Sequence, residues 1–192
     1  MSDNTPGSGA PTPASPEPSR LVAVWDLPLR LSHWLLAGSV LIAWFSANVY
    51  DTLHEISGYL ALGVLIFRLA WGFAGGPNSR FRNYLHSPRA TLRYLAGLGR
   101  GQSSRSLGLN PAGAAMALTL LASIVVATVS GWMQLTVTFF GVAWVENLHR
   151  WTSNLVIVLV VVHVLGVLVM CVLLRENLVR AMITGRKRAE TN

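Results

Sequence analysis

The stretch from Glu146 to Gly166, ENLHRWTSNLVIVLVVVHVLG, decides the fold, because it combines a long apolar run with two histidines. Almost every residue after Asn154 is Val, Leu or Ile, which predicts a helix inside a membrane. His149 and His163 lie fourteen residues apart, so they occupy nearly the same face of this helix, about 21 Å from each other along its axis. An ionisable side chain at membrane depth is costly, so two of them at this spacing indicate a function.

The composition is that of a membrane protein. Of the 192 residues, 52% are hydrophobic and 12% are charged, whereas a soluble domain carries about 25% charged residues. The formal net charge of +7 could suggest a nucleic-acid partner, but we do not expect one in so apolar a chain. The positions of the basic residues relative to the apolar spans instead predict the orientation in the membrane. Cys171 is the only cysteine of the sequence, which excludes an internal disulfide and a cysteine-based metal cluster.

Four apolar spans predict an all-α transmembrane four-helix bundle. Each span holds about 18 to 24 residues, enough to cross a hydrocarbon core of about 30 Å. The four spans belong to one predicted domain, residues 21–187, in which a long connection, 75–110, joins the second span to the third. The predicted spans are 31–49, 56–73, 111–133 and 151–174.

The two ends of the chain are predicted to lie outside this domain. Residues 1–20 consist largely of Pro, Ser, Gly and Thr, with little to bury and without the apolar stretch of a signal peptide. We therefore expect a disordered N-terminal tail at 1–20 and a short C-terminal tail at 188–192.

The basic residues predict the orientation of the bundle. The long connection and the C-terminal segment are rich in arginine, whereas the short turn between the first two spans carries Asp51 and Glu55. Cytoplasmic loops carry the excess of Lys and Arg, so both termini and the long connection are predicted to be cytoplasmic. Within that connection, Ser87 as a cap and Pro88 at the first position predict a short interfacial helix. The arginines of the connection are Arg80, Arg82, Arg89, Arg93, Arg100 and Arg105.

This topology sorts four histidines into two levels. His54 opens the second span and His149 opens the fourth, so both are predicted near the outer face. His33 lies near the start of the first span, and His163 lies about 21 Å below His149, so both are predicted toward the inner side. Each level therefore holds two histidines from two different helices, which is a ligand geometry.

Two imidazoles with no nearby carboxylate or thiolate suit bis-imidazole ligation of haem iron between helices. A zinc or copper site would favour three or four close ligands, and a proton relay would benefit from acids within the spans. A lone intramembrane histidine is often only hydrogen-bonded to a neighbouring helix, but this explains four histidines at two matched levels less well. We predict two non-covalent b-type haems, with iron ligands His33, His54, His149 and His163.

Several motifs between Leu21 and Lys187 resemble the bacterial cytochrome b561 superfamily. The nearest branch is the one related to the b-type cytochrome subunit of nickel–iron hydrogenases. The resemblance implies a multi-pass protein of the bacterial inner membrane, in which two bis-histidine haems b pass electrons between the quinone pool and a donor or acceptor. The family's ligand histidines fall on the four positions named above. The motifs are VWDLPLRLSHW, LHEISGYLALGVLIFRLAWGF, LGLNPAG, LHRWTSNL, VVH and RENLVRAMITGRK.

Two features separate the chain from the hydrogenase subunits. Those subunits tend to have His-Asn-Pro where this chain has Leu109, Asn110 and Pro111, and they carry a further span. The four-span branch is often associated with periplasmic c-type cytochromes or dehydrogenases, so we expect such a redox partner, with quinone or quinol in the bilayer. Two alternatives stay open: a stand-alone quinone-linked oxidoreductase acting on a small oxidant such as superoxide, and a non-redox histidine-bearing membrane module.

Three arginines are candidate partners of haem propionates. Arg68 lies fourteen residues after His54, on the same face of the second span and at the depth of the inner haem. It also lies close enough to the end of its span to extend to the inner surface instead. Arg30 and Arg150 lie beside the predicted ligands of the first and fourth spans.

Overall fold

The computed structural model describes residues 21–101 and 108–188. The predicted N-terminal tail, Arg105 and most of the predicted C-terminal tail lie outside these residues. The described part contains β1 (Leu21–Ala23), α1 (Leu27–Ser46), α2 (Asp51–Ala74), the 3₁₀ turn η1 (Phe81–Asn83), α3 (Pro88–Gly99), α4 (Pro111–Gln134), α5 (Ala143–Leu174), α6 (Leu178–Thr184) and β2 (Arg186–Arg188).

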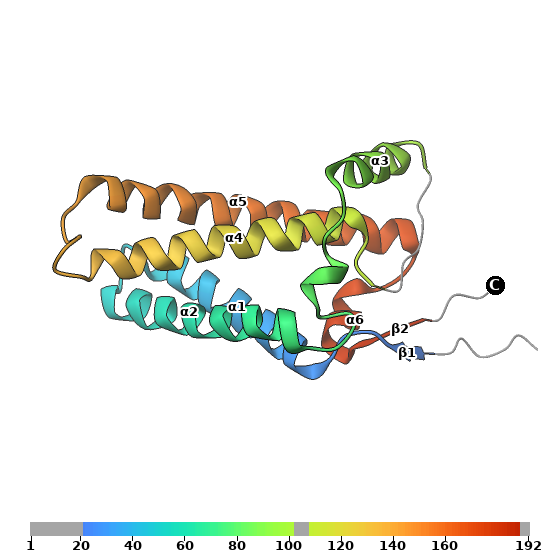
Figure 1. The fold of residues 1–192 in the computed structure, drawn as a ribbon, viewed down its shortest axis with the longest axis horizontal. Helices are drawn as coiled ribbons and strands as arrows, with labels where there is room; N and C mark the ends of the chain where they lie inside the picture. Colours follow the sequence, from blue (N-terminus) through green and yellow to red (C-terminus); the bar gives the residue numbers. More distant parts are fainter. Residues whose placement is uncertain (1–20, 102–107, 189–192) are drawn as a thin grey trace, which may run out of the picture.

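Among the described residues, four helices are long and apolar enough to cross a membrane: α1, α2, α4 and α5. They run side by side, with the short elements collected at one end (Figure 1). The predicted all-α transmembrane four-helix bundle is confirmed. However, α1 begins at Leu27 and α5 at Ala143, earlier than the predicted 31 and 151. α1 starts at its Asp26 cap, ahead of Arg30, and α5 continues through the polar residues before Trp151, because a helix can extend beyond the hydrocarbon core that the predicted spans describe.

Three helices begin with a side-chain cap and an early proline. The side chains of Asp26, Ser87 and Asn110 each accept a hydrogen bond from the backbone N–H three residues later. A proline fits the first turn, where the missing N–H leaves no helical bond unmade. The predicted starts of α3 at Pro88 and of α4 at Pro111 are therefore confirmed.

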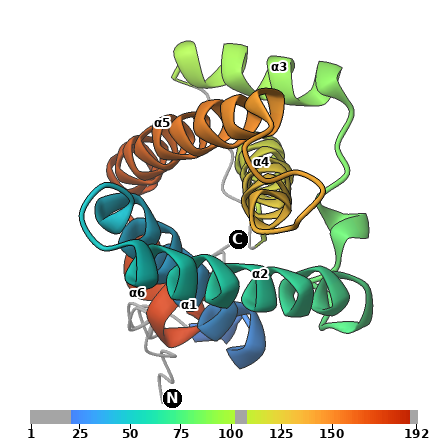
Figure 2. The same ribbon diagram turned by 90° about the vertical axis from the view of Figure 1, so that its left-hand side faces the viewer.

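The four long helices form two hairpins. α1 packs along α2 and α4 packs along α5, while the hairpins meet mainly through α2 and α4. Figure 2 shows the bundle end-on, with α1 and α2 on one side and α4 and α5 on the other. The backbone of α5 comes close to that of α1 or α2 at very few positions. On that side, the two hairpins are farther apart than the usual packing distance of about 8–10 Å between helices.

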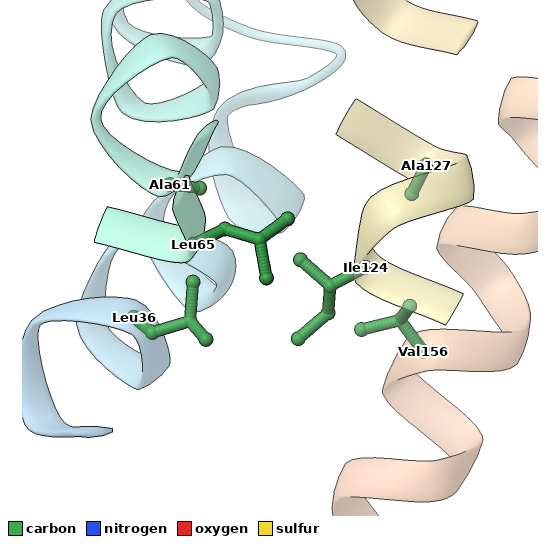
Figure 3. Packing of buried hydrophobic residues seen from close by; sticks show 6 residues of the cluster. All are labelled: Leu36, Ala61, Leu65, Ile124, Ala127 and Val156. Atoms are coloured by element: carbon green, nitrogen blue, oxygen red, sulfur yellow. The ribbon is translucent and has the colours of Figure 1, made fainter. Parts of the chain in front are cut away.

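A small apolar layer joins the two hairpins about half-way along the bundle. Val156 of this layer lies seven residues from both His149 and His163 in α5, so the layer separates the two histidine levels. Its close packing, drawn in Figure 3, is the kind of contact that associates helices in a membrane. The buried members are Leu36, Ala61, Leu65, Ile124, Ala127 and Val156.

The two ends of the described chain meet at one end of the bundle. β1 and β2 form an antiparallel two-stranded sheet that was not predicted. Lys187 in β2 is buried, lies 5.6 Å from the Trp25 ring centroid and donates to the Gly108 carbonyl. We call this the terminal end, and the opposite end, with the connections 47–50 and 135–142, the turn end (Figure 1).

Asp26 joins the start of α1 to the end of α2 at the terminal end. Its carboxylate accepts hydrogen bonds from the Leu29 N–H at 2.9 Å and from the Ser79 hydroxyl at 2.6 Å. The Trp71 indole N–H, at 3.2 Å, and the Gly76 N–H, at 3.3 Å, also donate to it. Partial burial alone would raise the pKa of this carboxyl, but the hydrogen bonds, above all that from Ser79, hold it below its ordinary 3.8. One ionised carboxylate thus fixes the long connection to the first span.

We expect Asp26→Ala to lower the thermal unfolding temperature in detergent, because it removes a cap worth about 0.5–2 kcal/mol and leaves several donors without their acceptor. Asp26→Asn should lower it less. A depressed folded-state pKa contributes stability that is present above the unfolded pKa and is lost as the pH falls through the folded one. The difference between wild type and Asp26→Asn should therefore shrink as the pH falls through and below the ordinary 3.8 of this carboxyl.

The control is Asp51→Asn, at the exposed start of α2. An equal loss of stability in this control, or a difference between wild type and Asp26→Asn that does not change with pH, would contradict the role given to Asp26.

Candidate functional site

The structure brings the four histidines together in two pairs. The ring centroids of His54 on α2 and His149 on α5 are 6.1 Å apart. Those of His33 on α1 and His163 on α5 are 6.4 Å apart. The first pair lies toward the turn end and the second toward the terminal end, with the apolar layer between them. α5 thus supplies one histidine to each level, on the side where it stands away from α1 and α2.

Backbone carbonyls orient both histidines of the first pair. His54 Nδ1 lies 2.8 Å from the carbonyl oxygen of Ala43, and His149 Nδ1 lies 2.8 Å from that of Ala127. A carbonyl oxygen only accepts hydrogen bonds, so Nδ1 carries the proton in both neutral rings and Nε2 keeps its lone pair. An imidazole held in this tautomer is oriented to bind a metal through Nε2.

Gly131 on α4 makes room for the His149 ring. A Cβ atom at this position would lie 2.9 Å from the ring Cε1 and 3.1 Å from Nδ1. The ring therefore lies directly against the backbone of α4, where it can donate to the Ala127 carbonyl. Gly131 was not among the predicted site residues, because a glycine in an apolar span is equally typical of helix packing.

The second pair leaves a ring nitrogen open. Nδ1 of His33 is buried and has no hydrogen-bond partner within the described residues. The same ring meets the edge of Trp34 at a centroid distance of 5.2 Å. A buried polar atom without a partner costs about 1–3 kcal/mol and calls for a bound group or a functional role.

Both centroid distances fit one metal ion between two imidazoles. With a metal–nitrogen bond of about 2 Å, a ring centroid lies about 3 Å from the metal, so two opposed rings have centroids about 6 Å apart. Within residues 21–101 and 108–188, no group of three or more His, Cys, Asp or Glu is placed to hold a metal ion. Each level therefore offers two neighbouring imidazoles and no third ligand among the described residues, which suits haem iron better than the closed ligand shell of zinc.

Arg68 is buried in α2 near His33. It is 6% exposed, and its Nη2 donates a hydrogen bond to the Tyr84 hydroxyl at 3.2 Å. Its Nη1 is buried and has no hydrogen-bond partner in the described part of the chain. Burial raises the pKa of the Tyr84 hydroxyl, although the charge of Arg68 opposes this rise, so the hydroxyl stays neutral. Arg68 therefore points its charge inside the protein instead of extending it to the surface.

The other two candidate arginines lie at opposite ends of the molecule. Arg30 donates a hydrogen bond to the Ile183 carbonyl in α6, and its Nε is buried without a partner among the described residues. Arg150 is exposed at the turn end, next to His149. The structure thus places Arg68 inside the bundle, Arg30 against the C-terminal helix and Arg150 at the surface.

Comparison with known proteins identifies the family. A family model described as prokaryotic cytochrome b561 matches residues 24–185, which include all four membrane helices and all four histidines. The chain belongs to this family. A search of curated proteins and a search of solved structures gave no match.

Membership in the prokaryotic cytochrome b561 family confirms the resemblance to the bacterial cytochrome b561 superfamily, while the nearer branch related to hydrogenase subunits stays a prediction. Together with the four apolar spans, it makes the chain a multi-pass membrane protein that binds haem b and takes part in electron transfer. The residues present fit such a group, because the histidines lie in pairs at centroid distances that leave room for one iron and a buried guanidinium leaves one nitrogen unpaired near His33.

We expect Gly131→Ala to disturb the bound haem, because the added methyl group pushes the His149 ring away from the Ala127 carbonyl. The low-spin EPR signal of the oxidised protein should shift, and part of the haem should be lost. Gly63→Ala on α2 is the matched control, because a Cβ there would meet nothing within 4 Å among the described residues. An unchanged EPR spectrum in Gly131→Ala would show that this contact does not orient a ligand.

Proposed function

We propose that the protein transfers electrons across the membrane through two bis-histidine haems b, between the quinone pool and a periplasmic redox partner. The outer site consists of His54 and His149, and the inner site of His33 and His163. The observation that carries this proposal is the presence of two close histidine pairs at two levels of one bundle, with centroid distances of 6.1 and 6.4 Å.

The protein's own contribution is to hold and insulate the ligands. In the outer site, the carbonyls of Ala43 and Ala127 fix the neutral tautomer and leave Nε2 as the ligand atom. In the inner site, the unpartnered Nδ1 of His33 shows that its ring is not tied to a backbone carbonyl. A bound haem would supply the redox chemistry, while the histidines would hold it and the surrounding helices would supply a low dielectric.

The two sites are separated along the axis of α5. The fourteen residues from His149 to His163 correspond to about 21 Å of helix rise. The apolar layer around Leu65 and Val156 fills the level between them. Such an arrangement would carry an electron from one side of the bilayer to the other in two short steps, with no ionisable side chain needed between the sites.

The arginines are proposed as partners of the haem propionates. Arg68 is the strongest candidate, because its buried Nη1 is without a partner in the described residues and its charge acts on His33. Arg150 would meet a propionate of the outer site at the surface. Arg30 would act at the inner site with the N–H groups that its bond to Ile183 leaves over.

The distribution of charge supports a bacterial inner-membrane location with both termini in the cytoplasm. The terminal end carries the arginine-rich connection as well as both ends of the described chain (Figure 1). Under the positive-inside rule, the terminal end is then cytoplasmic and the turn end periplasmic.

A separate protein is proposed as the outer redox partner. The two connections at the turn end, 47–50 and 135–142, are too short to form a catalytic domain. The acids near them, Asp51, Glu55 and Glu146, favour a partner with a basic docking face. A c-type cytochrome or a dehydrogenase, including a hydrogenase-like subunit, would fit this surface.

We expect about two non-covalent haems per chain by pyridine haemochrome assay.

Substitution of each histidine by methionine should show which two histidines bind the same haem. Met/His ligation raises the reduction potential of a haem. His54→Met and His149→Met should therefore raise the potential of one and the same haem, and His33→Met and His163→Met that of the other. His86→Met, in the long connection, is the control and should change neither. Shifts of different haems in the His54 and His149 variants would contradict the pairing.

A second test addresses the partner. We expect haems reduced by a quinol in liposomes to be reoxidised quickly by an added c-type cytochrome, and slowly by small oxidants alone. His54→Ala, which should lack the outer haem, is the control and should not respond to the cytochrome. If superoxide reoxidises the wild-type haems at enzymatic rates with no protein acceptor present, a stand-alone quinone-linked oxidoreductase replaces the electron-transfer relay.

A further inference from the structure

A buried guanidinium lies between the inner histidine pair and the long connection. Arg68 sits six residues before the end of α2, and His33 sits six residues after the start of α1. Because α1 and α2 form a hairpin, the two residues are at similar depth, and the charge of Arg68 acts on His33. Within the described residues, Arg68 has no carboxylate as an ion-pair partner, although a buried charge is costly unless it is paired.

Two aromatic rings from the long connection cover this guanidinium. The guanidinium carbon of Arg68 lies 5.2 Å from the ring centroid of Phe81 and 5.7 Å from that of Tyr84. Both distances are within the range of cation–π attraction. The Tyr84 hydroxyl accepts from Arg68 Nη2 and donates to the Asn78 carbonyl at 3.3 Å. We call residues 81–84 the aromatic turn.

The aromatic turn is itself fixed to the bundle. A Cβ atom at Gly72 would lie 2.1 Å from Cε2 of Phe81, so the ring lies directly on the backbone of α2. The segment that precedes the turn is bound to the start of the first span, through the Ser79 hydroxyl on Asp26 at 2.6 Å and the Asn78 amide on the Val24 carbonyl at 3.0 Å. The position of Arg68 is therefore set by the cytoplasmic connection as well as by its own helix.

We infer that the aromatic turn is a positioning element of the inner haem site, which holds Arg68 so that its free Nη1 pairs with a propionate and sets the reduction potential of that haem. The inference rests on the proposed function. A fixed positive charge beside a haem favours the reduced, less positive iron, and hydrogen bonding and charge around the haem tune its potential. Tyr84 and Phe81 act through Arg68 and need no contact with the haem.

The test is redox titration of the purified full-length protein in lipid nanodiscs. Arg68→Gln should lower the potential of the inner haem, the one shifted by His33→Met, and leave the outer haem unchanged. We expect about a tenfold loss of preference for the reduced state, which is about 59 mV for a one-electron couple. Arg68→Lys should restore most of the potential, because it restores the charge.

Tyr84→Phe separates the aromatic turn from Arg68 itself. This variant keeps the ring and removes only the hydroxyl that accepts from Nη2, so the inner potential should fall in the same direction by a smaller amount. Tyr94→Phe on α3 is the matched control, a tyrosine in the same connection for which neither potential should change.

The possible outcomes are distinct. An unchanged inner potential in Tyr84→Phe overturns the inference, even if Arg68→Gln does not fold, and so does an equal shift of both haems in either variant. If wild-type protein contains only one haem, or if His33→Met shifts none, the proposed function fails instead.

Discussion

Nearly every carbonyl oxygen in a membrane helix accepts a hydrogen bond from its own helix. The outer histidine pair depends on two such oxygens that accept a second hydrogen bond. In a hydrocarbon environment, every backbone N–H and C=O must be satisfied internally. A carbonyl oxygen can still accept a second hydrogen bond, and Ala43 and Ala127 do so from His54 and His149. These two bonds set the tautomers, restrict the orientation of the rings and join each histidine to the neighbouring helix.

The helices of the bundle pack unevenly. Each hairpin is closely packed, whereas the two hairpins touch along α2 and α4 and through one thin apolar layer. Both histidine pairs lie between α5 and the first hairpin, where α5 has few close backbone contacts with α1 or α2. At the terminal end, the first hairpin is joined to the segment after α5 by the pairing of β1 with β2 and by the hydrogen bond from Arg30 to the Ile183 carbonyl.

The fold and the histidine pairs could be predicted from the sequence because both depend on local spacing. Helical periodicity places His149 and His163 on one face. The capping residues Ser87 and Asn110 predict where α3 and α4 start. The rest depends on contacts between distant segments that no local pattern encodes. Gly131 matters only because a ring from α5 lies against it. The start of α5 was missed because apolar residues mark the hydrocarbon core, whereas a helix can extend beyond it.

The same limit applies to the charged residues. The pairing of β1 with β2 joins three-residue strands from the two ends of the domain, too short for an alternating pattern to stand out. The bond from Arg30 to Ile183 spans 153 residues, and the bond from Arg68 to Tyr84 depends on how the connection folds back onto α2. The depth of these side chains in the membrane could be predicted from the sequence, but their hydrogen-bond partners could not.

The pairing of β1 with β2 has a consequence for the order in which the molecule is made. β2 follows α5 in the chain, so a ribosome completes it only after all four membrane helices have been synthesised. Until then, β1 has no partner strand and Trp25 lacks its contact with Lys187. Closure of this end by β1 and β2 is therefore a late event in biogenesis.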